Sequence, residues 1–187
     1  MYSEIPFFVM QITRNVKYAA TASSDSSVLL WDVDTGEEIT AFKGHQDSVN
    51  ILAFNPDSTL LATASHDKTV IVWKAAFNPL CTCTCTCACT TLNCGRSHAS
   101  AQTQVTDGKI VYQLEHSSAP TCLLWSPNGD QIATAHGTVF TLWSSKASGK
   151  TLFEVEDAHA ALISCLTYHP QGIFISPLYS SLKFFMI

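Results

Sequence analysis

Hydrophobic residues along the chain fall into short runs that are separated by polar turns. Residues 49–57 read VNILAFNPD, residues 58–65 read STLLATAS and residues 66–73 read HDKTVIVW. The runs are rich in Val, Ile, Leu, Phe and Thr, and the turns contain Asn-Pro-Asp-Ser and His-Asp-Lys, which predicts three short strands joined by tight hairpins. Apolar residues occupy both faces of these strands, which indicates burial between two neighbouring sheets. The more polar segment 36–42, GEEITAF, is expected to form a strand at an outer edge.

One of these runs recurs along the chain and ends each time in tryptophan. Residues 21–32 read TASSDSSVLLWD and residues 63–74 read TASHDKTVIVWK, so that Trp31 and Trp73 hold the same place in the two copies. A third and weaker copy, TAHGTVFTLW, ends at Trp143. Self-similarity at a period of about 40 residues is typical of proteins that stack units of four strands each.

The motif residues resemble those of the WD-repeat family, whose repeats form the blades of β-propellers. The resemblance rests on Gly44-His45, Asn55-Pro56-Asp57, Ser65, Asp67, Trp73 and the Trp31-Asp32 pair. It implies an all-β fold, namely an incomplete WD-repeat β-propeller. We expect about three to four blades of four-stranded antiparallel sheet, whereas closed propellers have roughly four to eight blades.

In this family a histidine, a serine or threonine, an aspartate and a tryptophan form a buried hydrogen-bonded tetrad within one blade. The best copy supplies His45, Ser65, Asp67 and Trp73. The first copy supplies Ser23, Asp25 and Trp31, with Ser3 where histidine belongs, and the third supplies His116 and Trp143 with no aspartate near Gly137. A His-Ser-Asp set could also suggest a nucleophilic triad, but we favour the structural interpretation because the serine is expected to be buried.

The resemblance also implies partner contacts on the top rim of the propeller. The matching positions are Ser48, Asn50 and His66 in the second blade, Phe8 and Ser24 in the first, and Thr121 and His136 in the third. We therefore expect a non-catalytic scaffold that binds a peptide or domain. An alternative is a substrate-receptor subunit of a ubiquitin ligase, but the arginine that some such receptors carry two residues after Trp-Asp is absent. No phosphate loop, activated nucleophile motif or informative pair of carboxylates suggests an enzyme.

A cysteine-threonine segment separates the second repeat from the third. The stretch from Trp73 to His116 is much longer than the corresponding stretch from Trp31 to His45, and the excess falls within residues 75–106. Its alternating thiols are Cys81, Cys83, Cys85, Cys87 and Cys89. Thiolates bind copper(I) and zinc, which leaves a metal site as an alternative, but the CxC spacing differs from the CxxC of structural zinc sites. We favour a low-complexity loop with no metal and no cofactor.

The chain accordingly divides into four segments. They are WD repeats 1 and 2 (1–74), the Cys/Thr-rich insert (75–106), repeat 3 with a partial repeat 4 (107–176) and a divergent tail (177–187). The fourth repeat begins at Ala158-His159 and loses the pattern where Pro177 interrupts the expected strand. Open ends of such an array expose blade faces, so we expect self-association or binding of a complementing propeller segment.

The overall composition narrows the range of partners and compartments. The 187 residues are 47% hydrophobic and 13% charged, with a net charge of −5, which argues against direct binding of nucleic acid. No long, uninterrupted apolar run predicts a membrane span. The N-terminus lacks a basic region and a small-residue cleavage site, so we expect a cytoplasmic or nuclear protein that is not secreted, with free thiols.

Overall fold

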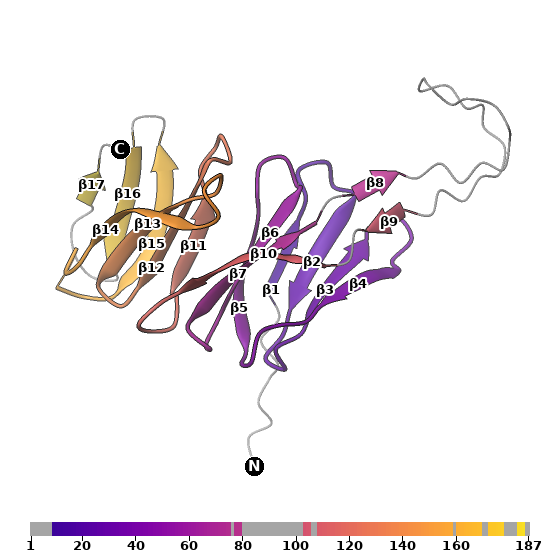
Figure 1. Cartoon of the computed structure of the whole chain (residues 1–187), viewed down its shortest axis with the longest axis horizontal. Helices are drawn as coiled ribbons and strands as arrows, with labels where there is room; N and C mark the ends of the chain where they lie inside the picture. Colours follow the sequence, from indigo (N-terminus) through magenta and orange to yellow (C-terminus); the bar gives the residue numbers. More distant parts are fainter. Residues whose placement is uncertain are drawn as a thin grey trace, which may run out of the picture.

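The described part of the chain consists of β-strands and the turns between them (Figure 1). The computed structural model describes residues 9–75, 77–79, 103–105, 108–158, 160–169, 172–177 and 183–185. Within these residues there is no helix that is long and apolar enough to cross a membrane. The strands form three four-stranded antiparallel sheets, a three-stranded sheet and a two-stranded ladder, which confirms the prediction of an all-β fold with four-stranded units.

The first sheet contains four strands in sequence order. They are β1 (Val9–Ile12), β2 (Tyr18–Ala22), β3 (Val28–Asp32) and β4 (Glu38–Phe42). The segment GEEITAF thus supplies the outermost strand, as its polar composition predicts. The turn between β2 and β3 holds Ser26 at a φ of 68°, which lies in the left-handed region.

The second sheet is completed by a strand from beyond the insert. Its order is β5 (Val49–Phe54), β6 (Leu60–Ser65), β7 (Thr69–Lys74) and β10 (Ile110–Glu115). Between β7 and β10 the chain forms the short ladder of β8 (Phe77–Pro79) with β9 (Thr103–Val105). Segment 75–106 therefore connects the third strand of this sheet to its outer strand.

The third sheet repeats the same topology, and a fourth sheet follows it. The third consists of β11 (Cys122–Trp125), β12 (Gln131–His136), β13 (Val139–Ser144) and β14 (Lys150–Val155). The fourth consists of β15 (Ile163–His169), β16 (Gly172–Pro177) and β17 (Lys183–Phe185). The segment 177–187, which diverges from the repeat in sequence, thus contributes the strand β17.

The sheets stand side by side in sequence order, with their first strands adjacent (Figure 1). Strand β1 lies beside β5, β5 beside β11, and β11 beside β15. One hydrophobic cluster fills each gap between neighbouring sheets. The burial of an apolar layer between sheets, at roughly 25 cal/mol per Å² of apolar surface, is the main force that holds such an array together.

The second sheet shows why its strands are apolar on both faces. Leu61, Ile71 and Trp73 pack against the first sheet, whereas Ala62 and Val72 pack against the third. Successive residues of a strand point to opposite faces, so a strand between two sheets buries side chains on both faces. The continuous apolar runs of the sequence follow from this placement.

Candidate functional site

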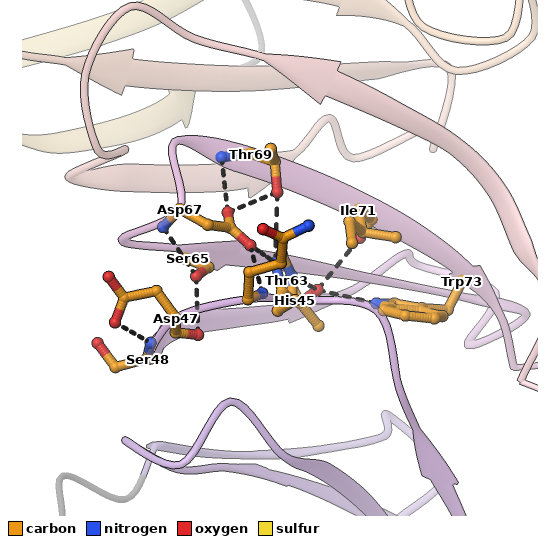
Figure 2. A network of polar contacts seen from close by, with 10 residues as sticks. His45, Asp47, Ser48, Thr63, Ser65, Asp67, Thr69, Ile71 and Trp73 are labelled. Carbon is orange, nitrogen blue, oxygen red and sulfur yellow. Dashed lines mark hydrogen bonds and ion pairs between the residues drawn. The ribbon is translucent and has the colours of Figure 1, made fainter.

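A polar network centred on the hydroxyl of Thr63 ties the second sheet together (Figure 2). The Thr63 Oγ1 atom lies 2.7 Å from His45 Nε2 and accepts a 2.8 Å hydrogen bond from Trp73 Nε1. His45 Nδ1 lies 2.8 Å from Asp67 Oδ2. A carboxylate only accepts, so Nδ1 carries a proton, and in the neutral ring Nε2 is the acceptor for the Thr63 hydroxyl. The same hydroxyl also lies 3.3 Å from Ile71 O. Every polar atom in this chain of contacts is therefore satisfied.

The Asp67 carboxylate joins this network to the turn between β6 and β7. Its Oδ1 accepts from Thr69 N at 2.9 Å and from Thr69 Oγ1 at 2.6 Å, and its Oδ2 accepts from Gln46 N at 3.0 Å. Partial burial raises the pKa of Asp67, but the hydrogen bonds from Thr69, Gln46 and His45 outweigh this effect and lower it to about 2. The carboxylate is thus ionised at neutral pH and fixes the loop that carries His45.

Gly44 precedes this histidine because a side chain there would collide with the network. A Cβ atom at Gly44 would lie 2.9 Å from Cη2 of Trp73, whose side chain is 1% exposed. Glycine lets the loop pass over the indole ring, and His45 then reaches Thr63. This close approach explains the glycine of the Gly-His motif. The backbone of Gly44 does not adopt a positive φ.

The central hydroxyl is that of Thr63, where the sequence analysis placed Ser65. Ser65 Oγ instead donates to Asp47 O at 3.0 Å and accepts from Asp67 N at 3.1 Å. The register explains the difference, because Leu61 pairs with Trp73. Thr63 lies two residues after Leu61 on the same face of β6 and is therefore close to the indole. Ser65 lies four residues after Leu61, about 13 Å along the strand. Ser65 supports the turn and does not contact the indole.

The missed residue has a recognisable signal in the sequence. Thr21, Thr63 and Thr134 each begin the segment TAS or TAH, at nearly the same distance before the tryptophan of their copy. All three hydroxyls accept a hydrogen bond of 2.8 Å from the indole of their own sheet. Thr63 is fully buried, so its hydroxyl is not available as a nucleophile and the network acts on structure.

The first sheet contains part of the same arrangement. Trp31 Nε1 donates to Thr21 Oγ1 at 2.8 Å, and Asp25 Oδ1 accepts from Ser27 N at 2.9 Å. Ser23 Oγ accepts from Asp25 N at 3.4 Å and thus lies in the turn, as Ser65 does. Hydrogen bonds from Ser27 lower the pKa of Asp25.

The third sheet lacks the aspartate, and its network is incomplete. His116 Nε2 lies 2.9 Å from Thr134 Oγ1, which accepts from Trp143 Nε1 at 2.8 Å. His116 Nδ1 is buried and has no hydrogen-bond partner among the described residues. Burial, followed by the neighbouring His136, lowers the pKa of His116 to about 4.

His136 does not lie on an exposed rim as the sequence analysis expected. It is 6% exposed, its Nε2 lies 3.0 Å from Ser117 Oγ, and its ring meets that of His116 edge to face at a centroid distance of 5.0 Å. The hairpin explains this, because His136 pairs with Val139 across a tight turn. The shorter turn places His136 in the register of Ser65, not of His66.

Four of the predicted rim residues lie on one edge of the array. Three belong to the second sheet and its turns, and Ser24 belongs to a turn of the first sheet. His66 and Ser24 are exposed in the turns that follow β6 and β2, and Ser48 is half-buried just before β5. Asn50 is half-buried at a register shift in β5, where a β-bulge redirects the side chain. The start of β5 and the end of its antiparallel neighbour β6 share this edge.

Thr121 directly precedes β11 of the third sheet, at the same edge. It is exposed, and its Oγ1 donates to Ile163 O at 2.8 Å. The hydroxyl thereby joins the third sheet to the fourth. The remaining predicted residues, namely Phe8 and the five cysteines of the alternative metal site, lie outside the described residues.

Comparison with known proteins agrees with this geometry. The family model of the WD domain, G-beta repeat, matches residues 36–74 and 108–144, the segments that hold the second and third networks. A chain in the crystal structure of the mitotic checkpoint complex has the same fold, with a TM-score of 0.69 at 15% identity over 94% of this chain and 46% of that one. The chain belongs to the WD-repeat family. Its three four-stranded sheets are blades of an incomplete β-propeller, as the sequence predicts.

Curated relatives of this WD-repeat chain are considerably longer. WD repeat-containing protein 37 of Pongo abelii is 43% identical over 163 residues, which cover 82% of this chain and 31% of that protein. U3 snoRNP-associated protein-like EMB2271 of Arabidopsis thaliana is 25% identical over 162 residues, covering 80% of this chain and 33% of that protein. The chain thus spans about a third of the length of these two relatives.

Proposed function

We propose that this chain is a non-catalytic scaffold that binds a peptide or protein domain along the rim formed by Ser24, Ser48, Asn50, His66 and Thr121. WD-repeat proteins in general serve as protein-interaction scaffolds. We assign the partner-binding surface of this chain to the rim. The observation that carries it is the alignment of exposed polar turns from successive blades on one edge. A row of this kind offers many hydrogen-bonding groups to one extended partner.

Backbone hydrogen bonds between blades support a rigid rim. Val49 N donates to Ser23 O at 3.2 Å, which joins the second blade to the turn of the first. His66 N donates to Ser48 O at 3.0 Å within the second blade, and Ile163 N donates to Gly137 O at 2.9 Å between the third and fourth. A surface that is ordered before binding loses little conformational entropy when a partner docks.

The chemistry of the rim favours a polar partner of mixed charge. Asp47 and Lys68 are exposed next to Ser48 and His66, so both signs of charge lie within one blade. Such a rim gives electrostatic selectivity without the strongly basic surface that phosphate backbones require. The structurally similar chain is itself a component of the mitotic checkpoint complex, which agrees with a role in protein assembly.

Paired surface variants would test this proposal. The double variant Ser48→Arg with His66→Glu changes the rim, whereas Asp57→Arg changes the exposed turn at the other end of β6 and serves as the matched control. Proteins captured from cells by the unmodified chain should be lost from the rim variant and kept by the control. Equal capture by all three chains, with unchanged circular dichroism, would contradict the proposed rim.

A further inference from the structure

A cavity of about 470 Å³ opens on the first sheet among side chains of β2, β3 and the turn between them. Thr21, Asp25, Ser27 and Trp31 contribute to its lining. The apolar residues of β2 and β3 on the opposite face, such as Leu30, pack against the second sheet. The cavity therefore faces away from the neighbouring blade.

The cavity residues match the network of the second blade position by position. Thr21 corresponds to Thr63, and Asp25 corresponds to Asp67. The indole of Trp31 donates to Thr21 at 2.8 Å, the same distance as in the second blade. The Oδ1 atom of each aspartate accepts the backbone N–H two residues later at 2.9 Å.

The two blades differ in what lies between the hydroxyl and the carboxylate. In the second blade the imidazole of His45 contacts both Thr63 Oγ1 and Asp67 Oδ2. In the first copy the corresponding residue is Ser3, and the sequence contains no histidine before His45. Among the described residues, none forms a hydrogen bond with Asp25 Oδ2 or accepts the hydroxyl proton of Thr21.

The two atoms together suit a neutral imidazole. The oxygen of Thr21 accepts from Trp31 and its hydroxyl carries one proton that can be donated, while the Asp25 carboxylate can only accept. A neutral imidazole carries one acceptor nitrogen and one donor N–H on the same ring, whereas lysine and arginine only donate and a carboxylate only accepts. An imidazole thus meets the two groups with two separate ring nitrogens, as His45 does in the second blade.

We propose that this cavity is a docking site for a histidine side chain presented by a partner polypeptide. Its volume exceeds that of one imidazole and admits the residues on either side. In the second blade Asp67 Oδ2 also accepts the backbone N–H of Gln46, the residue after the histidine, at 3.0 Å. The partner segment presents its own following N–H to Asp25 Oδ2 in the same way. This site is separate from the rim contacts of the second and third blades.

The test uses the full chain and a short acetylated, amidated peptide with the sequence Gly-His-Gln-Asp-Ser, which copies residues 44–48. The indole N–H resonance of Trp31, assigned with Trp31→Phe, is followed by NMR as peptide is added. We expect a saturable shift that disappears when alanine replaces the histidine of the peptide. Asp25→Asn should weaken binding at least tenfold, and Asp57→Arg, in the exposed turn at the other end of β6, should bind as the unmodified chain does.

The variant Ser3→His provides an independent readout. It adds an imidazole at the sequence position that matches His45, so we expect it to raise the midpoint of denaturant unfolding and to prevent the peptide-induced shift. The proposal is overturned if the histidine and alanine peptides shift the Trp31 resonance equally, or if Asp25→Asn binds as tightly as the unmodified chain. Ser24 of the rim also lines the cavity, but the rim variants change only Ser48 and His66. Loss of partner capture by those variants would leave this result unchanged, so the two proposals fail separately.

Discussion

Replacing Thr63 with valine tests the central contact of the second blade. Valine keeps the shape and β-branching of threonine but removes the hydroxyl. Thr63 is 0% exposed, and its Oγ1 contacts His45 Nε2 at 2.7 Å and Trp73 Nε1 at 2.8 Å. The substitution therefore leaves two polar groups without partners, one of them on a side chain that is 1% exposed.

The expected loss follows from these two groups. A buried donor or acceptor without a partner costs roughly 1–3 kcal/mol, so Thr63→Val should lower the free energy of unfolding by about 2–6 kcal/mol. Ser65→Ala removes only contacts to the backbone of Asp47 and Asp67, and should cost about 1 kcal/mol. Thr151→Val, at an exposed position of β14, is the matched control and should change little.

Denaturant titration followed by tryptophan fluorescence and far-UV circular dichroism would measure the three losses. The predicted order is Thr63→Val, then Ser65→Ala, then Thr151→Val, with the slope against denaturant unchanged. If Ser65→Ala destabilised the chain more than Thr63→Val, the assignment of Thr63 as the bridge between histidine and tryptophan would be refuted.

Three further predictions concern other parts of the array. Gly44→Ala should destabilise the chain by about 1–3 kcal/mol, since its Cβ would crowd the Trp73 indole; unfolding titrations would show this. The folded-state pKa of His116 lies near 4, below its ordinary 6.5, so the unfolded chain binds more protons between these values. Stability should fall as pH drops from 6.5 toward 4, and His116→Gln should flatten that dependence in titrations at each pH. Replacing residues 80–102 with an Asn-Gly turn should leave thermal melting nearly unchanged, because closure entropy varies slowly with loop length.

The sequence alone predicted the strands of the repeats and their grouping into four-stranded sheets, whereas β8, β9 and β17 fall in segments that the repeat pattern does not cover. The regular spacing of Trp31 and Trp73, with turn residues at fixed offsets from each, reflects the size of identical structural units. The polar segment before Gly44 is correctly predicted as an outer strand, because an outer strand packs less than the strands inside it. The completion of the second sheet by β10, beyond the insert, follows from the same repeat spacing.

The identity of the bridging hydroxyl depends on the cross-strand register, which periodicity leaves open. Thr63 and Ser65 lie on the same face of β6, and the pairing of Leu61 with Trp73 shows that Thr63 is the one nearer to the indole. The burial of His136 likewise depends on a turn that is shorter than its counterpart in the second blade. A deletion in a turn shifts every residue next to it, so alignment by motif assigns the wrong neighbour.

Site-specific photocrosslinking in living cells would locate the surface of this chain that contacts a partner protein. A photoreactive amino acid is placed at His66, in the exposed turn on the rim, or at Asp57, in the exposed turn at the opposite end of β6. We expect the chain with the reactive group at residue 66 to form a discrete crosslink to a partner protein, and the chain labelled at residue 57 to form none. Crosslinks to the same partner from residue 57 and none from residue 66 would contradict the proposed rim.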